Sequence, residues 1–253
     1  MTAHDDLLAR HRAVMPDWLT LYYDHPIALA HGDGRRVTDA EGRTYLDFFG
    51  GILTTMLGYA IPEVTEAIAE QASRIIHAST LYLSEPMVEL AEAIAAASGI
   101  DDAKVFFTTS GSEANEAALL LASTVRRSNQ VLAVRNSYHG RSFATMGVTG
   151  NRGWSTSSLS PFSVCWLASG YRFRSPFRHL AADAAAFTAA CVEDLREVVA
   201  TQTAGDVACL IAEPIQGVGG FAVPPDGFLG AYQDALGDLG VLVIADEVQT
   251  GWG

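Results

Sequence analysis

The C-terminal stretch of the chain reads Val241-Leu242-Val243-Ile244-Ala245-Asp246-Glu247-Val248-Gln249-Thr250-Gly251. Apolar residues rich in β-branched types come first, two acids follow, and a glycine-containing turn then opens. This pattern is typical of a buried parallel strand that delivers carboxylates to the carboxyl edge of an open α/β sheet, where ligands bind. A carboxylate at that edge can hold a protonated ring nitrogen through a charge-assisted hydrogen bond. The stretch therefore predicts an α/β fold with a ligand site at the end of this strand.

Composition and charge narrow the class of protein. Apolar residues make up 49% of the 253 residues and charged residues 18%, which is the balance of a soluble globular protein. We expect no membrane span and no signal peptide, because no apolar run is long enough and residues 1–20 lack a basic start. The net charge of −13 argues against nucleic acid and anionic membranes as partners. Three scattered cysteines favour the reducing cytoplasm, and no metal site is expected.

The N-terminal part is predicted to form an arm and a small lobe, residues 1–58. A short helix over residues 1–20 would end at Met15-Pro16, and turn residues at 32–34 and 39–42 would precede a strand at 45–49. Gly50-Gly51 would then bend the chain sharply. Residues 59–253 are predicted to form a large cofactor-binding domain that is incomplete, with its C-terminal part missing.

Strands and helices alternate through this large domain. Helices are predicted to begin at Pro62 and Pro86. Next come a strand at 105–109, a helix at 113–125, and strands at 131–135, 209–212 and 241–245. This order favours a mainly parallel sheet flanked by helices. Residues 150–180 interrupt the alternation, and we expect a surface loop there, with an excursion near the site as the alternative.

The segment Thr108-Thr109-Ser110-Gly111-Ser112-Glu113-Ala114-Asn115-Glu116 follows a predicted strand and opens a helix. Small residues let backbone N–H groups approach an anion, the Ser112 hydroxyl can add a bond, and the helix dipole favours negative charge. The same pattern fits an ordinary serine N-cap with acids in the first turn. The segment matches no dinucleotide fingerprint, which disfavours a Rossmann nucleotide binder.

Two further segments follow strands at the same predicted edge. In Asn136-Ser137-Tyr138-His139-Gly140-Arg141, the aromatic can stack on a flat ring and the arginine can bind a carboxylate. For His139 itself, a structural hydrogen bond is favoured over catalysis. Glu213-Pro214-Ile215-Gln216-Gly217 adds an acid and a glycine that allows close backbone approach. The three segments would thus bring an anion cradle, an aromatic face and carboxylates to one edge.

Four motifs, at 109–116, 138–140, 213–217 and 246–251, together resemble those of the class III aminotransferases, which are pyridoxal-phosphate (PLP) enzymes of fold type I. They occur in the family's order, and the resemblance runs from about Tyr22 to Gly253. Residues 45–52 and 77–82 most resemble the alanine–glyoxylate aminotransferase 2-like branch. The fold implied is that of fold type I, with a small N-terminal lobe.

The resemblance also implies roles for single residues. Gly111 and Ser112 would hold the phosphate of PLP. Tyr138 would stack on one face of the pyridine ring while Val248 packs on the other. Asp246 and Gln249 would complete the cofactor-binding set.

Asp246 would be the catalytic carboxylate that pairs with the protonated ring nitrogen, and Gln249 would hydrogen-bond near the phenolic oxygen. Three residues would serve the substrate. Arg141 would contact a substrate carboxylate, Glu213 would pair with a substrate or site arginine, and Ile52 would line the entrance. The resemblance implies that Ile52 could reach the site from the other subunit of a homodimer.

Lys104 is the only lysine of the chain. The resemblance implies a Schiff-base lysine beyond the motif at 246–249, together with a small C-terminal domain, and residues 1–253 contain neither. We therefore expect a truncated portion of a longer enzyme that has no transaminase activity by itself, because no lysine can bind the cofactor or shuttle the substrate proton.

The predicted function is transfer of an amino group from an amino-acid donor to a 2-oxo acid or glyoxylate through PLP. Transfer from 4-aminobutyrate or acetylornithine is the alternative specificity. A catalytically dead fragment that binds cofactor or mediates dimerisation is the alternative of another class. The absent lysine favours that alternative, whereas four intact motifs favour recent truncation over long drift.

Overall fold

A computed structural model describes residues 3–19 and 21–251 of the chain. The chain divides into two compact units, residues 1–104 and residues 105–253. The predicted division between residues 58 and 59 falls inside the first unit and stays a prediction about the complete domains. Among the described residues, none of the helices combines the length and apolar character that crossing a membrane requires.

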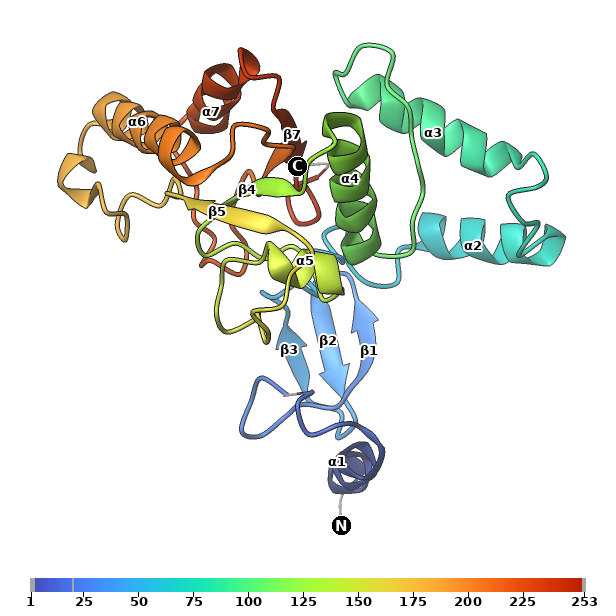
Figure 1. Cartoon of the computed structure of the whole chain (residues 1–253). Coiled ribbons are helices and arrows are strands. Elements are labelled where there is room, and N and C mark those ends of the chain that lie inside the picture. Colours follow the sequence, from blue (N-terminus) through green and yellow to red (C-terminus); the bar gives the residue numbers. More distant parts are fainter. Residues whose placement is uncertain (1–2, 20, 252–253) are drawn as a thin grey trace. The chain divides into compact units, whose positions relative to one another are not determined.

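The first unit contains an antiparallel sheet of order β1-β2-β3 and three helices (Figure 1). The predicted turn at 39–42 is confirmed, because Asp39 accepts hydrogen bonds from the backbone N–H groups of Glu41 and Arg43. The strand predicted at 45–49 is shorter, because Asp47 accepts the N–H groups of Phe49 and Gly50 and turns the chain. The elements of this unit are α1 (Ala3–Val14), β1 (Leu29–Asp33), β2 (Arg36–Asp39), β3 (Thr44–Leu46), α2 (Pro62–Arg74) and α3 (Glu85–Ala97).

The second unit is a parallel four-stranded sheet of order β5-β4-β6-β7 with helices on both faces. This arrangement confirms the predicted mainly parallel sheet flanked by helices. Its elements are α4 (Gly111–Arg126), β4 (Gln130–Val134), α5 (Phe143–Gly147), β5 (Ser163–Leu167), η1 (Arg178–Leu180), α6 (Ala184–Gln202), β6 (Cys209–Ala212), α7 (Phe228–Gly237) and β7 (Leu242–Ala245).

The core of the second unit lies on both faces of the sheet, because side chains alternate along each strand. Leu132 and Leu210 pack on one face against α6 and α7. Val131 and Ile211 pack on the other face against Leu119 of α4. Every residue of β6 is buried, which explains its continuous apolar sequence. The two helical layers fix the strand ends from which the site is built.

Three sequence predictions about this unit are wrong. The last strand was expected to be buried, but most of β7, which lies at the edge of the sheet, is exposed. The strand predicted at 105–109 does not form, since these residues make no ladder with any described strand. An apolar β-prone run becomes a strand only when a neighbour pairs with it. Conversely, the interruption at 150–180 contains β5, which pairs in parallel with β4 at the edge of the sheet. Flanking Ser, Gly and Pro residues obscured this short strand.

Candidate functional site

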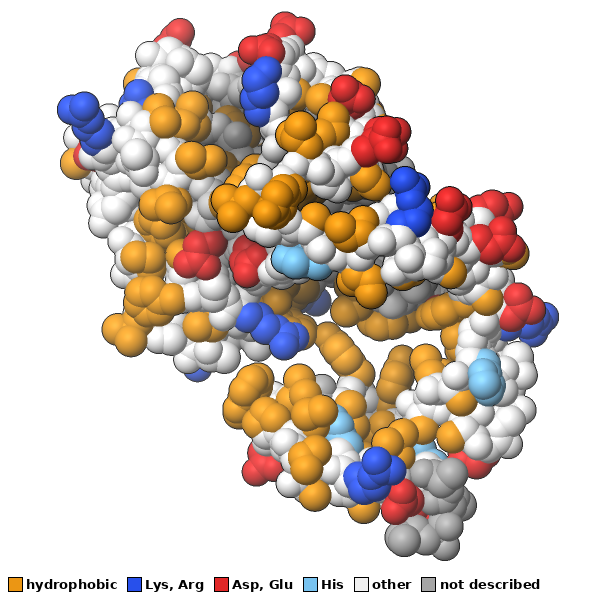
Figure 2. Space-filling model, turned by 90° about the vertical axis from the view of Figure 1, so that its right-hand side faces the viewer, with side chains coloured by type: hydrophobic (Ala, Val, Ile, Leu, Met, Phe, Trp, Pro, Cys, Tyr) orange, Lys and Arg blue, Asp and Glu red, His pale blue; other side chains and the backbone are white. Residues whose placement is uncertain are grey.

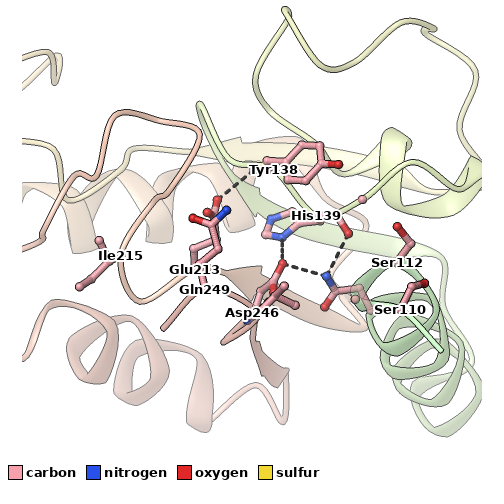
Figure 3. A pocket seen from close by; sticks show the side chains of 12 residues that line it. Ser110, Ser112, Tyr138, His139, Glu213, Ile215, Asp246 and Gln249 are labelled. Carbon is pink, nitrogen blue, oxygen red and sulfur yellow. Dashed lines mark hydrogen bonds and ion pairs between the residues drawn. The ribbon is translucent and has the colours of Figure 1, made fainter. Parts of the chain in front are cut away.

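A pocket of about 190 Å³ lies where α4 begins and where β4, β6 and β7 end (Figure 3). It is the place that the strand-end pattern predicts, because the carboxyl ends of parallel strands face the N-termini of the connecting helices. Seven of the predicted site residues line it: Gly111, Ser112, Tyr138, Glu213, Asp246, Val248 and Gln249. Their grouping is a feature of the structure, and their individual roles stay predictions.

The N-terminus of α4 forms one wall of the pocket. The Ser110 hydroxyl accepts the N–H of Glu113 at 3.2 Å, so this serine is the N-cap of α4. A serine N-cap is the ordinary alternative that the sequence allowed for this segment. The Glu113 carboxylate accepts the backbone N–H and hydroxyl of Thr109, which lower its pKa. Capping leaves the first helical amides, those of Gly111 and Ser112, without acceptors inside the helix. The N-cap is therefore confirmed, and anion binding stays a prediction with which the capped end is compatible, since it still offers donors.

Close contacts around two glycines shape this wall. A Cβ atom added at Gly111 would lie 2.8 Å from Cγ2 of Val248, so only glycine lets α4 and the turn after β7 approach this closely. A Cβ at Gly140 would collide with the Ser112 hydroxyl, and the φ of Gly140 is +135°. Ser112 Oγ also accepts the backbone N–H of Arg141 at 3.1 Å. No acceptor for the Ser112 hydroxyl hydrogen is found among the residues that the structure describes, so this hydrogen could serve a ligand.

Asp246 is the most firmly held acid of the pocket. Its side chain is 4% exposed, and Oδ2 lies 2.7 Å from Nδ1 of His139 and accepts a hydrogen bond from Nδ2 of Asn115 at 2.8 Å. Oδ1 accepts the backbone N–H of Val248 at 3.3 Å. Because an ionised carboxylate only accepts, His139 Nδ1 carries the hydrogen. Three donors thus fix one buried carboxylate. His139 makes a structural hydrogen bond of the kind that the sequence favoured, and its part in the chemistry stays a prediction.

Glu213 holds two loops through its carboxylate. Oε1 accepts the N–H of Tyr138 and Oε2 accepts the N–H of Gly217, both at 2.9 Å. Burial raises the pKa of Glu213, and these two backbone donors oppose that rise. Its predicted pairing with an arginine has no counterpart among the described residues and stays a prediction.

Two polar atoms in the pocket wall have no hydrogen-bond partner within residues 3–19 and 21–251: Nε2 of His139 and Oε1 of Gln249. A Cβ at Gly217 would collide with Oε1 of Gln249, so only a glycine at position 217 leaves room for the Gln249 amide. Buried polar atoms of native proteins are nearly always satisfied. These two orphan atoms indicate that the pocket is built to receive polar groups from outside the chain.

The remaining predicted residues, Arg141 and Ile52, are not among the residues that line the pocket. Arg141 directly follows Gly140, is exposed, and places its guanidinium carbon 5.8 Å from the ring centroid of Trp154. Ile52 belongs to the first unit, is 47% exposed, and has a φ of +58°, which is strained for a β-branched residue. Its predicted place at the substrate entrance stays a prediction.

Sequence reasoning assigned no role to three residues that the structure brings to the site. Asn115 is 5% exposed and joins Asp246 to the carbonyl of His139, and Ile215 lines the pocket. Trp154 packs its ring against that of Tyr138 at 5.3 Å. A signal existed for Asn115, since it lies four residues after Gly111 and four before buried Leu119, on one helical face. For Trp154 the sequence contained no such signal, because this residue lies in an irregular segment without a regular spacing.

Comparison with known proteins gives a consistent result. A family model described as aminotransferase class-III matches residues 22–253. An acetylornithine aminotransferase from Methanothermobacter thermautotrophicus is 38% identical over 232 residues, which cover 92% of this chain and 53% of that protein. The mitochondrial alanine–glyoxylate aminotransferase 2 homolog 2 of Arabidopsis thaliana is 35% identical over 248 residues, covering 98% and 50%.

A solved structure shows the same fold. The PMP-bound form of an aminotransferase from Vibrio fluvialis superposes with a TM-score of 0.86 at 27% identity. It covers 97% of this chain and 56% of the other. The chain therefore spans about half the length of the relatives it matches.

Proposed function

The chain belongs to the class III aminotransferase family, and from this premise we propose that it forms the PLP site of an aminotransferase. The reaction transfers an amino group from an amino-acid donor to a 2-oxo acid or glyoxylate. The observation that carries the proposal is the Asp246 carboxylate, buried and fixed by three donors at the end of β7. A fixed negative charge in a partly dry pocket suits a protonated ring nitrogen.

The other pocket residues fit the same cofactor. Backbone N–H groups of Gly111 and Ser112 and the Ser112 hydroxyl would bind the phosphate. Tyr138 and Val248 would pack on the two faces of the ring. The Gln249 amide, whose buried oxygen has no partner among the described residues, would hydrogen-bond near the phenolic oxygen.

When bound, PLP supplies an electron sink for the electron pair left on the substrate Cα as its proton departs. The contribution of this chain is positional. Asp246 would keep the positive charge on the ring nitrogen, and His139 and Asn115 would keep the carboxylate in place. Glu213 would hold the loop that carries Tyr138 against the ring.

The substrates and the assembly are part of the proposal. Arg141 would bind a substrate carboxylate bidentately, and Ile52 would line the substrate entrance. The names of the relatives support both acetylornithine-type and alanine–glyoxylate-type specificity, and 4-aminobutyrate is a further candidate donor. A homodimer is proposed because the first unit exposes large apolar side chains, which mark interaction surfaces. Three buried free cysteines suit a cytoplasmic location.

Cofactor binding without turnover is the second candidate function for residues 1–253 by themselves. The observation that favours it is the lysine content: Lys104, the only lysine, pairs with Asp102 at 2.5 Å and does not line the pocket. Aminotransferase chemistry needs an amine that binds the cofactor and moves the substrate proton. We expect PLP to bind and no amino group to be transferred.

The test is a titration of the 253-residue chain with PLP, followed by absorbance, alongside a transaminase assay and an NAD titration. PLP is expected to bind and NAD is not. Asp246→Ala is expected to weaken PLP binding about 10- to 100-fold, which corresponds to the loss of a hydrogen bond to a charged group. Asp238→Ala, an exposed acid at the end of α7, is the matched control and should bind PLP like the unaltered chain. Equal affinities of the two variants would contradict the assignment of Asp246, and measurable turnover would contradict the second candidate.

A further inference from the structure

Trp154 does not line the pocket, but it contacts two residues to which the proposed function gives roles. Its ring meets that of Tyr138 edge-on, with centroids 5.3 Å apart and planes at 67°. The guanidinium carbon of Arg141 lies 5.8 Å from the centroid of the same indole. An indole is the aromatic side chain that attracts a cation most strongly, and 5.8 Å is within the range of that attraction. One side chain therefore touches both the aromatic wall and the nearby cation.

The loop that carries Trp154 is itself fixed to the strand-end loop after β4. The N–H of Trp154 donates to the carbonyl of Asn151 at 3.0 Å, and the N–H of Asn151 donates to the carbonyl of Ser137, also at 3.0 Å. The Asn151 amide donates to Oδ1 of Asn136 at 2.8 Å. The backbone of Trp154 is thus anchored to the loop from which Tyr138 and Arg141 emerge, which places the indole beside both residues.

The charged end of Arg141 is available to a ligand. Its backbone N–H binds the Ser112 hydroxyl, which fixes the start of the side chain beside the proposed phosphate site. In the part of the chain that the structure describes, the guanidinium takes part in no salt bridge. A guanidinium placed over an aromatic face can keep N–H groups free for a carboxylate, and a side chain already held by the ring loses less rotamer freedom on binding.

We propose that Trp154 is a positioning residue that holds Arg141 ready for a substrate carboxylate. Through that contact, Trp154 makes the site prefer amine donors that carry a carboxylate over donors that carry none. The inference rests on the proposed function, because it takes Arg141 as the residue that binds the substrate carboxylate. The irregular segment after residue 150 thereby contributes to specificity, although it supplies no pocket-lining residue.

The test uses the 253-residue chain and two stable, reduced conjugates of the cofactor. Phosphopyridoxyl-glutamate carries the carboxylates of an amino acid, and phosphopyridoxyl-propylamine is the same molecule without them. Neither needs a lysine of the protein, since the bond between cofactor and amine is already formed. Isothermal titration yields the ratio of the two dissociation constants, and Arg141→Gln gives the ratio when the guanidinium is absent.

Trp154→Leu is expected to reduce the preference for the glutamate conjugate about three- to tenfold, towards the ratio of Arg141→Gln. Trp154→Phe keeps an aromatic face and is expected to retain more of the preference. It is also the second variant to rely on if leucine at this position perturbs folding. Weaker bracing of Tyr138 would affect both conjugates alike, so it cancels in the ratio.

An unchanged ratio in the Trp154 variants would overturn the inference, even if each variant bound both conjugates more weakly. An equal loss of affinity for both conjugates in Arg141→Gln would overturn it too, because the guanidinium would then serve the phosphate or the ring. If the unaltered chain bound neither conjugate, the proposed function would fail and the inference with it. If every variant bound both conjugates with an unchanged preference, the inference would be wrong but the proposed function would stand.

Discussion

The two units of the chain bury their apolar side chains to very different extents. In the second unit, every residue of β6 is buried and α6 alone contributes four buried residues. In the first unit, Val37 and Asp39 are the only buried residues among those described, and neither α2 nor α3 has any. Yet both helices have the proline starts and apolar spacing that the sequence predicts. A correct local pattern therefore makes a helix, but it does not make a core.

The exposed apolar residues of the first unit sharpen this contrast. Phe48 is 93% exposed, Ile76 86% and Leu83 97%. Hydrophobic side chains are plentiful at the surface in Figure 2 as well. Such exposure marks surfaces that bind another surface, and here it supports the proposed dimer. The second unit also exposes apolar side chains, such as Phe106 and Val125, but it has a buried core beneath its pocket, whereas the first unit has almost none.

The largest expected effect comes from a matched pair of leucine substitutions. Leu210→Ala in β6 should lower the free energy of unfolding by about 2–5 kcal/mol, because it opens a cavity at a side chain that is 0% exposed. Leu90→Ala in α3, where the side chain is 52% exposed, should change it by about 0.5 kcal/mol or less. Urea denaturation measures both. A cost above about 1.5 kcal/mol for Leu90→Ala would show that α3 is covered in solution and would break the contrast.

A smaller effect is expected at the buried polar network of the second unit. Asn115→Asp replaces the amide that donates to Asp246 and to the His139 carbonyl with a carboxylate that cannot donate. We expect a loss of about 1–3 kcal/mol in the free energy of unfolding, together with weaker PLP binding. Asn129→Asp is the control, since the side chain of this exposed asparagine makes one hydrogen bond, to the Pro161 carbonyl. Equal unfolding midpoints for the two variants would show that the network does not fix the carboxylate.

Acid should affect the first unit locally. Burial raises the pKa of Asp39, but hydrogen bonds from Arg43, Tyr45 and the turn backbone outweigh this and lower it from 3.8 to about 2. Because the folded pKa is the lower one, the stabilisation is complete above pH 3.8 and is lost as the pH falls towards 2. Amide signals of Thr38 and Thr44 should report fraying of β2 and β3 in that window. In Asp39→Asn this acid transition should disappear, and its persistence would assign it to another group.

The smallest effect is expected at the cysteines, all of which lie in the second unit. Burial raises the pKa of Cys191 and Cys209 to about 12 and also raises that of Cys165. Almost no thiolate exists at neutral pH, so a thiol reagent should not label the native chain within minutes. All three cysteines should react in urea. Rapid labelling of the native chain would show that the second unit opens as easily as the first.

Much of the second unit was predictable from sequence, because its signals are local. The strands at 209–212 and 241–245 are continuous apolar runs, and the helix at 113–125 follows small residues that cap it. The rule that parallel strands end at one edge then groups Gly111, Tyr138, Glu213 and Asp246 around one pocket. The roles of these residues come from family resemblance, and ligand titrations of the site variants test them.

The sequence predictions that were wrong are those that depended on which segments pair as strands. The segment at 105–109 has the composition of a strand but forms none, whereas β5 has turn-forming neighbours but pairs with β4. A strand is defined by hydrogen bonds to another segment, and composition carries no record of whether that segment is beside it. The contacts of Trp154 with Tyr138 and Arg141 were hidden for the same reason, since they cross an irregular loop.

The sequence by itself determined the α/β alternation, the capped helix start at Ser110 and the acid that ends the last strand, because each depends on a few neighbouring residues. Tertiary structure alone decided how that acid is held. Asp246 meets an amide 131 residues away and an imidazole 107 residues away. Local patterns act over one or two turns of chain, whereas a buried carboxylate is stabilised by whichever donors the packed layers bring within hydrogen-bonding distance.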